Sequence, residues 1–348
     1  MSASSISSSY LATSLLPSIA QAQSQLSSLE VESTTGQYAD IGLQLGDQSG
    51  YELSLKNQTD LLQTLTTGNA LVTTNLTTTQ DALNSILTDA QSAASSLTTW
   101  TSGAADAGST LQTLGVNALQ SLIGTTNTTS NGQYVFGGVN SSVAPMTGYS
   151  TAQNTIATAF EHYFGFAPTD AAAANVTAAQ MQTFLTGAFG SLFSGAGWTT
   201  NWSSASSVNQ TAQIAPGETI DASSNANQAG FQQLTEAYAM LAGFGGTELS
   251  SAAQQEVAST ATSLVTQGVS SITGTEAGVG ALLKRVTNAN TSMSSQMTIL
   301  QTQIGNLDDV DTATAATKLN SLSTQLQTAY ELTAQLQKLS LAQYLPVS

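Results

Sequence analysis

The sequence lacks cysteine and has a single histidine, His162. The absence of cysteine excludes disulfides, thiolate metal ligands and cysteine nucleophiles. One histidine excludes any site that needs two imidazole groups, and it argues against a Ser-His-Asp triad. No other set of side chains is marked out for catalysis by its spacing. We therefore expect a protein that is not an enzyme and that has no catalytic residue, no metal site and no cofactor.

Basic residues are scarce. Lys and Arg number 5 against 21 Asp and Glu, which gives a formal net charge of -16 at pH 7. Such a chain has no basic surface to neutralise the phosphates of nucleic acid or of anionic lipid. Only 7% of the residues are charged, far below the roughly 25% of an ordinary globular protein. We expect neither nucleic acid nor a membrane among the partners.

Long apolar runs are also missing, since none approaches the ~20 residues of a membrane-spanning helix. The first thirty residues contain neither Lys nor Arg, so they do not have the basic start of a cleavable signal peptide. If the chain leaves the cell, we expect it to do so by another route.

Both ends of the chain have the periodicity of an amphipathic helix. Near the N-terminus, with Pro17 near the predicted helix start, the apolar positions are Leu15, Ile19, Ala22, Leu26 and Leu29. Near the C-terminus they are Leu319, Leu322, Leu326, Ala329, Thr333 and Leu336, followed by Leu341 and Leu345. Residues 308–311 separate this stripe from an earlier one over 283–307. Their three aspartates favour a helix break with a capping acid over a cation site.

A second helical stretch begins near Tyr51, after a glycine-rich connector. Apolar residues repeat there at steps of three and four over 62–90, with polar residues at two seam positions, Asn69 and Thr79. The pattern fades near Gly103 and then resumes. A continuous helix over 51–123 would be roughly 100 Å long.

The middle of the chain, about 133–220, concentrates the aromatic residues and three of the 5 prolines. A short strand between turns is expected over 132–138. We interpret this segment as an insert with its own aromatic core, although a ligand- or carbohydrate-binding module resting on the same rings is an alternative. The pair Glu161-His162 and the basic pair Lys284-Arg285 are interpreted as surface residues.

These patterns predict a mainly α fold: long antiparallel N- and C-terminal helices packed as a coiled-coil-like bundle, with a small α/β or β-containing insert. The expected parts are terminal assembly helices (1–32 and 312–348), a long-helix core domain (33–145 and 223–311) and a surface-exposed insert domain (146–222). Short helices are marginal alone, so we expect the terminal stripes to gain order by packing within and between subunits. The predicted assembly interface is Leu15, Ile19, Leu26, Leu29, Leu322, Leu326, Leu336, Leu341 and Leu345.

Several motifs near the two ends resemble the bacterial flagellin superfamily over about 1–145 and 225–348. The C-terminal ones are the "VD" break at 310–311, the Gln-rich helix after it, and Ser340-Leu341 with the near-terminal Leu345. The connector 35–46 (TGQYADIGLQLG) is similar to that of the alphaproteobacterial hook-filament junction proteins, also called hook-associated protein 3. The SSGLRIN…DDAAG connector of filament flagellin is absent, as is the Ser-Asp-Asp-Pro element of commoner junction proteins.

The resemblance implies a secreted structural subunit of the flagellum, involved in motility and exported unfolded by the flagellar type III apparatus. Its partners would be copies of itself, flagellin, another hook-associated protein and a flagellar export chaperone. Filament flagellin, which forms the filament itself, is the alternative within the superfamily.

Overall fold

The computed structural model describes residues 8–100 and 107–344, and the side chains of 15–100 and 107–335. The chain folds into two compact units. Unit 1 combines the chain up to Gln63 with the chain from Ser294, and unit 2 is Thr64–Met293. The finer division into three parts that the sequence suggested stays a prediction.

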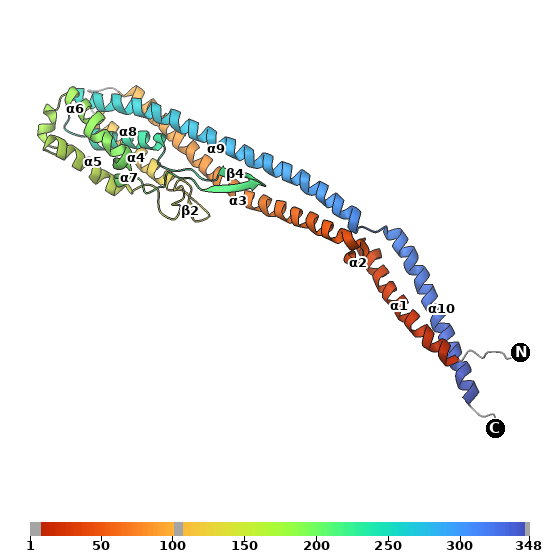
Figure 1. Ribbon diagram of the computed structural model, residues 1–348. Coiled ribbons are helices and arrows are strands. Elements are labelled where there is room, and N and C mark those ends of the chain that lie inside the picture. The colour runs from red at the N-terminus through yellow and green to blue at the C-terminus, as the bar shows by residue number, and fades with distance from the viewer. Residues whose placement is uncertain (1–7, 101–106, 345–348) are drawn as a thin grey trace. The chain divides into compact units, whose positions relative to one another are not determined.

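Unit 1 is built from helices that come from both ends of the chain. These are α1 (Ser8–Thr35), the short α2 (Ile41–Leu45) with a 3-10 turn (Gly46–Gln48), α10 (Thr312–Tyr344), and parts of α3 (Ser49–Thr99) and α9 (Ser251–Asp308). Helices α1 and α10 lie side by side (Figure 1). They are antiparallel, because Gln23 contacts Tyr330 while Gly36 lies beside Thr312.

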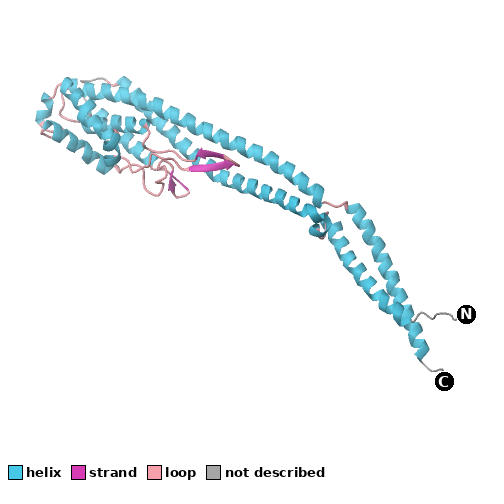
Figure 2. Cartoon of the chain, viewed as in Figure 1, coloured by secondary structure: helices cyan, strands magenta, loops and turns pink. Residues whose placement is uncertain are grey.

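Unit 2 contains the rest of α3 and α9, several shorter helices and two β-hairpins. The helices are α4 (Ala107–Thr126), α5 (Tyr149–Phe164), α6 (Ala178–Phe184), α7 (Gly195–Asn201) and α8 (Ala229–Phe244). The antiparallel hairpins pair β1 (Thr129–Ser130) with β2 (Gln133–Tyr134), and β3 (Thr211–Ala215) with β4 (Glu218–Asp221). Short 3-10 segments at Ala171–Asn175 and Gly190–Phe193 and a π-helical turn at Leu185–Phe189 complete it. The predicted mainly α fold with small β elements is confirmed (Figure 2).

Three local predictions need correction. Helix α1 begins at Ser8, so Pro17 lies inside the helix, where its ring cannot donate the usual backbone hydrogen bond. The connector after Gly36 contains the helical turn α2. Asp40 caps the start of this turn, because its carboxylate accepts a hydrogen bond from the Leu43 amide at 2.9 Å. Helix α3 ends at Thr99 and α4 begins at Ala107, so 51–123 is not one helix; Gly103 itself lies outside the described residues.

Glycine allows α4 and α8 to pack backbone against backbone. A Cβ atom on Gly115 of α4 would lie 2.3 Å from the Ala242 nitrogen of α8. At Gly245, just after α8, a Cβ would lie 2.5 Å from the Gln112 nitrogen, and at Gly108 it would lie 2.7 Å from the Gly245 carbonyl oxygen. Real Cβ atoms are not found at these distances, so the contact between the two helices requires glycine at all three positions.

The core of unit 2 is aromatic, and it is shared between the middle segment and α8. Phe160, Phe184 and Phe189 of the middle segment lie 5.2–5.6 Å from the Phe244 ring of α8, measured between ring centroids. All four rings are fully buried. The aromatic core that the sequence predicts for the insert therefore extends beyond the insert, onto α8. Because these four rings are buried, they cannot stack on a carbohydrate.

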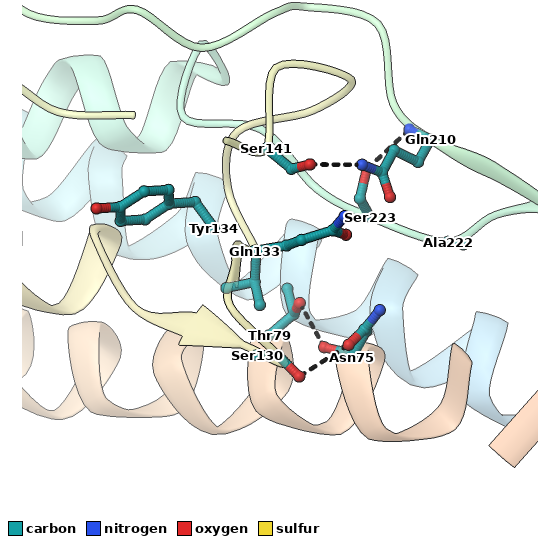
Figure 3. A pocket seen from close by; sticks show the side chains of 10 residues that line it. Asn75, Thr79, Ser130, Gln133, Tyr134, Ser141, Gln210, Ala222 and Ser223 are labelled. Atoms are coloured by element: carbon teal, nitrogen blue, oxygen red, sulfur yellow. Dashed lines mark hydrogen bonds between the residues drawn. The ribbon is translucent and has the colours of Figure 1, made fainter. Parts of the chain in front are cut away.

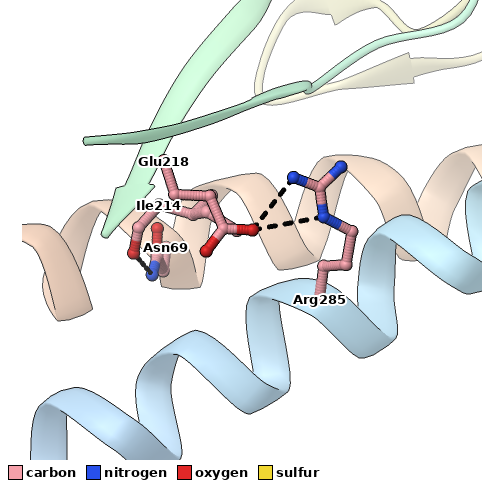
Figure 4. A network of polar contacts seen from close by, with 4 residues as sticks. All are labelled: Asn69, Ile214, Glu218 and Arg285. Atoms are coloured by element: carbon pink, nitrogen blue, oxygen red, sulfur yellow. Dashed lines mark hydrogen bonds and ion pairs between the residues drawn. The ribbon is translucent and has the colours of Figure 1, made fainter. Parts of the chain in front are cut away.

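The polar seam position Asn69 of α3 is explained by the β3–β4 hairpin that packs on it. The Asn69 side-chain amide Nδ2 donates to the backbone carbonyl of Ile214 in β3 at 2.8 Å and to the side-chain oxygen Oδ1 of Asn290 in α9 at 2.6 Å. Arg285 of α9 holds the same hairpin with two hydrogen bonds to one carboxylate oxygen of Glu218, at 2.9 and 3.2 Å (Figure 4). Asn69 thus fixes one register of hairpin and helix pair, as a seam asparagine does in a coiled coil.

A matched pair of substitutions in α4 tests the glycine contact. Gly115→Ala adds a Cβ where α8 leaves no space, and we expect it to lower the free energy of unfolding of unit 2 by about 1–3 kcal/mol. Gly124→Ala adds the same atom where nothing lies within 4 Å, and we expect a change between zero and a gain of about 1 kcal/mol. Urea denaturation followed by circular dichroism measures both. Equal effects at the two positions would contradict the packing argument.

A half-buried carboxylate in unit 2 predicts a pH dependence. Glu236 of α8 lies with a carboxylate oxygen beside Gly190, and burial raises the pKa of Glu236 to about 7. The unfolded chain loses this proton near pH 4.5, so stability falls as the pH rises from about 4.5 to about 7. We expect Glu236→Gln to raise the free energy of unfolding by about 1–3 kcal/mol at pH 8 and by less at pH 5. The exposed Glu248→Gln is the control; an equal gain at both pH values for Glu236→Gln would refute the assignment.

Candidate assembly interface

The predicted interface residues that the structure describes lie along α1 and α10. Ile19 of α1 and Leu326 of α10 are buried, with 9% and 6% of their surface exposed. Leu15, Leu26, Leu29 and Leu322 are half-buried. The seam between two helices of one chain therefore accounts for much of their contact. The remaining three, Leu336, Leu341 and Leu345, have side chains outside the described residues.

Unit 1 buries little apolar surface. Among its described side chains only five apolar ones are buried: Ile19, Leu55, Leu62, Ala315 and Leu326. Nine large apolar side chains are exposed: Leu16, Val31, Leu43, Tyr51, Leu53, Leu61, Ile299, Tyr330 and Leu332. Among its own described side chains, unit 2 exposes five over a longer stretch of chain: Leu71, Val139, Val143, Tyr163 and Val208. A concentration of exposed large apolar residues favours association, so unit 1 is the part of the chain better suited to it.

The periodic pattern in the sequence does not identify the outward-facing residues of unit 1. Leu43 of α2 is 83% exposed, and Leu332 of α10 is 51% exposed. The periodic pattern selects the residues that two helices of one chain use for each other. A large apolar residue off that pattern, such as Leu16 beside Ile19, is the signal that could have identified the outer surface.

The helix breaks of unit 1 lie next to each other. The Tyr38 amide donates to the Asp308 carbonyl at 3.0 Å, and the Val310 amide donates to the Gly36 carbonyl at 2.7 Å. Gln37 and Asp309 form an antiparallel bridge between these bonds. The chain segments that follow α1 and α9 are thus hydrogen-bonded to each other, although they come from opposite ends of the sequence.

Asp311 caps the start of α10, as the sequence predicted. Its carboxylate accepts from the Thr314 hydroxyl at 2.8 Å and from the Ala313 amide at 2.9 Å. These hydrogen bonds, with that of the Thr314 hydroxyl foremost, lower the pKa of Asp311 below its usual value. The carboxylate is therefore charged at neutral pH and favours the positive end of the α10 dipole. No group of three metal-ligating side chains is found in the described parts of the chain.

Two hollows of unit 2 hold residues of interest from the sequence. His162 lines an open groove of about 490 Å³ with Tyr163 and Asn201, and none of the residues lining it is acidic. A polar cavity of about 10 Å³ lies between α3 and the hairpins, lined by Asn75, Thr79 and Ser130 among others (Figure 3). The smaller cavity has room for about one water molecule. Searched over its described residues, the chain has no helix long and apolar enough to cross a membrane.

Comparison with known families gives two matches, one at each end of the chain. The bacterial flagellin N-terminal helical region matches residues 6–141, and the bacterial flagellin C-terminal helical region matches residues 262–345. Together they cover more than half of the chain. The C-terminal match begins later than the resemblance expected from about 225. No curated protein matches the chain at a significant level.

Two leucines of α10 distinguish the inner seam from the outer surface. We expect Leu326→Ala to lower the free energy of unfolding of unit 1 by about 2–4 kcal/mol, because it opens the seam with α1. Leu332→Ala should leave the monomer unchanged and weaken self-association. Circular dichroism melts and analytical ultracentrifugation measure the two effects. The assignment would be contradicted if Leu332→Ala lowered the stability of the monomer. It would also be contradicted if this variant had a stable monomer and self-associated as strongly as the wild type.

Proposed function

We propose that this chain, which belongs to the bacterial flagellin family, is the subunit that joins the flagellar hook to the filament. The family consists of structural proteins that self-assemble into the extracellular flagellum. Within it, the choice of the junction subunit rests on one observation, the connector TGQYADIGLQLG over 35–46. It resembles the connector of hook-filament junction proteins, and the filament flagellin connector is absent.

The proposed mechanism of assembly is burial of the outer apolar surface of unit 1. A two-helix pair covers only one face of each helix, so Leu16, Val31 and Leu332 stay in water until a neighbouring subunit covers them. Each fully buried leucine contributes roughly 1.5–3 kcal/mol. The predicted interface residues Leu15, Ile19, Leu26, Leu29, Leu322, Leu326, Leu336, Leu341 and Leu345 would hold the terminal helices together and extend this contact to neighbours.

The proposed partners follow from the position of such a subunit. Copies of the chain would form a ring, with another hook-associated protein on the hook side and flagellin on the filament side. The chain would be exported through the flagellar type III apparatus without a cleaved signal peptide, and an export chaperone would hold α10 before export. The thin core of unit 1 supports this route, because a helix pair with few buried contacts unfolds at low cost.

Immunogold labelling of intact flagella with antibody against this chain tests the proposal. We expect label at one point at the base of the filament. Label along the whole filament would identify the chain as filament flagellin and overturn the junction assignment. Purified protein gives a second measurement: a junction subunit alone should self-associate into small assemblies at most, whereas long filaments formed without other proteins would also contradict the proposal.

A further inference from the structure

An acidic side chain is buried at the point where the two helix breaks of unit 1 meet. Asp308 is the last residue of α9, and only 1% of its surface is exposed. Its backbone carbonyl accepts the Tyr38 amide of the opposite segment. Its carboxylate oxygen Oδ1 has no hydrogen-bond partner among the described residues. A buried carboxylate without a compensating charge is strongly unfavourable.

One lysine compensates this charge. The Lys56 ammonium lies 3.1 Å from Asp308 Oδ2, and it also pairs with Glu52, one helical turn earlier on α3. Glu52 is itself buried, with 8% of its surface exposed. We call these three residues the Lys56 cluster. The hydrogen bond to Glu52 is the largest of the effects that raise the pKa of Lys56 above its usual value, so the ammonium stays charged over the physiological range.

We propose that Lys56 holds the two helix breaks of unit 1 together by neutralising the buried Asp308 carboxylate. Without this cation, Asp308 has to reach water. Because Asp308 ends α9 and its carbonyl binds Tyr38, that movement would separate the paired segments around Gly36 and Val310. The Lys56 cluster would thus act as a conformational lock on unit 1.

The low number of basic residues strengthens this inference. The chain has only 5 Lys and Arg, and in the part of the chain whose side chains are described no cation other than Lys56 is paired with Asp308 or Glu52. Every contact in the cluster lies within one chain. The lock therefore exists in the monomer, and its test does not depend on the proposed role in the flagellum.

Hydrogen exchange at the Tyr38 and Val310 amides tests the lock in the full-length monomer. We expect Lys56→Met to speed exchange at both amides at least tenfold, because it leaves two buried carboxylates unpaired. The triple variant Lys56→Met with Glu52→Gln and Asp308→Asn should return exchange to within about threefold of the wild type, since neutral amides replace both uncompensated charges. Lys318→Met, at an exposed lysine of α10, is the matched control and should have no effect.

Three results would overturn the proposal. Unchanged exchange at Tyr38 and Val310 in Lys56→Met would show that the lysine does not hold the breaks. Equally fast exchange in the single and the triple variant would show that packing, and not charge, is lost. Faster exchange throughout unit 2 in Lys56→Met would show a global effect in place of a local one.

Discussion

A pair of helices can cover only one side of each partner, and this constraint governs unit 1. Helices α1 and α10 bury Ile19 and Leu326 between them but leave large apolar residues on their outer sides. An isolated globular protein would add a third layer to cover them. This chain provides no such layer within the described residues of unit 1, so its apolar surface is available to other copies. Self-assembly, the property of its family, is the means by which that surface can be removed from water.

Unit 2, in contrast, covers its apolar core with its own side chains. Glycines let α4 and α8 approach until their backbones touch, and the aromatic rings of the middle segment fill the space beside Phe244. Asn69 and Arg285 then fix the β3–β4 hairpin in one register. These contacts are close backbone approach, ring packing and directed hydrogen bonds. Each of them is compatible with few other residues or geometries. Unit 2 therefore has a specific core that needs no partner, whereas unit 1 has few buried apolar side chains.

Local signals in the sequence predicted much of this arrangement. The aspartates at 308–311 indicated a break, and the periodic leucines around Ile19 and Leu326 indicated which faces of α1 and α10 meet. Contacts between distant residues could not be predicted in this way. Nothing near Asp308 in the sequence indicates that it is buried, because its partner Lys56 lies on α3. In the same way, Gly115 carries no sign that α8 passes over it, and Phe244 carries no sign that it completes the aromatic core of the middle segment.

The scarcity of lysine and arginine affects how readily proteases outside a cell can cleave the chain. Trypsin-like proteases cut only after these residues, and they bind their substrates as extended chain. All five such sites, Lys56, Lys284, Arg285, Lys318 and Lys338, lie inside α3, α9 or α10. Cleavage would first require a helix to unwind, and at Lys56 and Arg285 also the loss of an ion pair. A composition poor in lysine and arginine thus leaves few points at which trypsin-like proteases can attack.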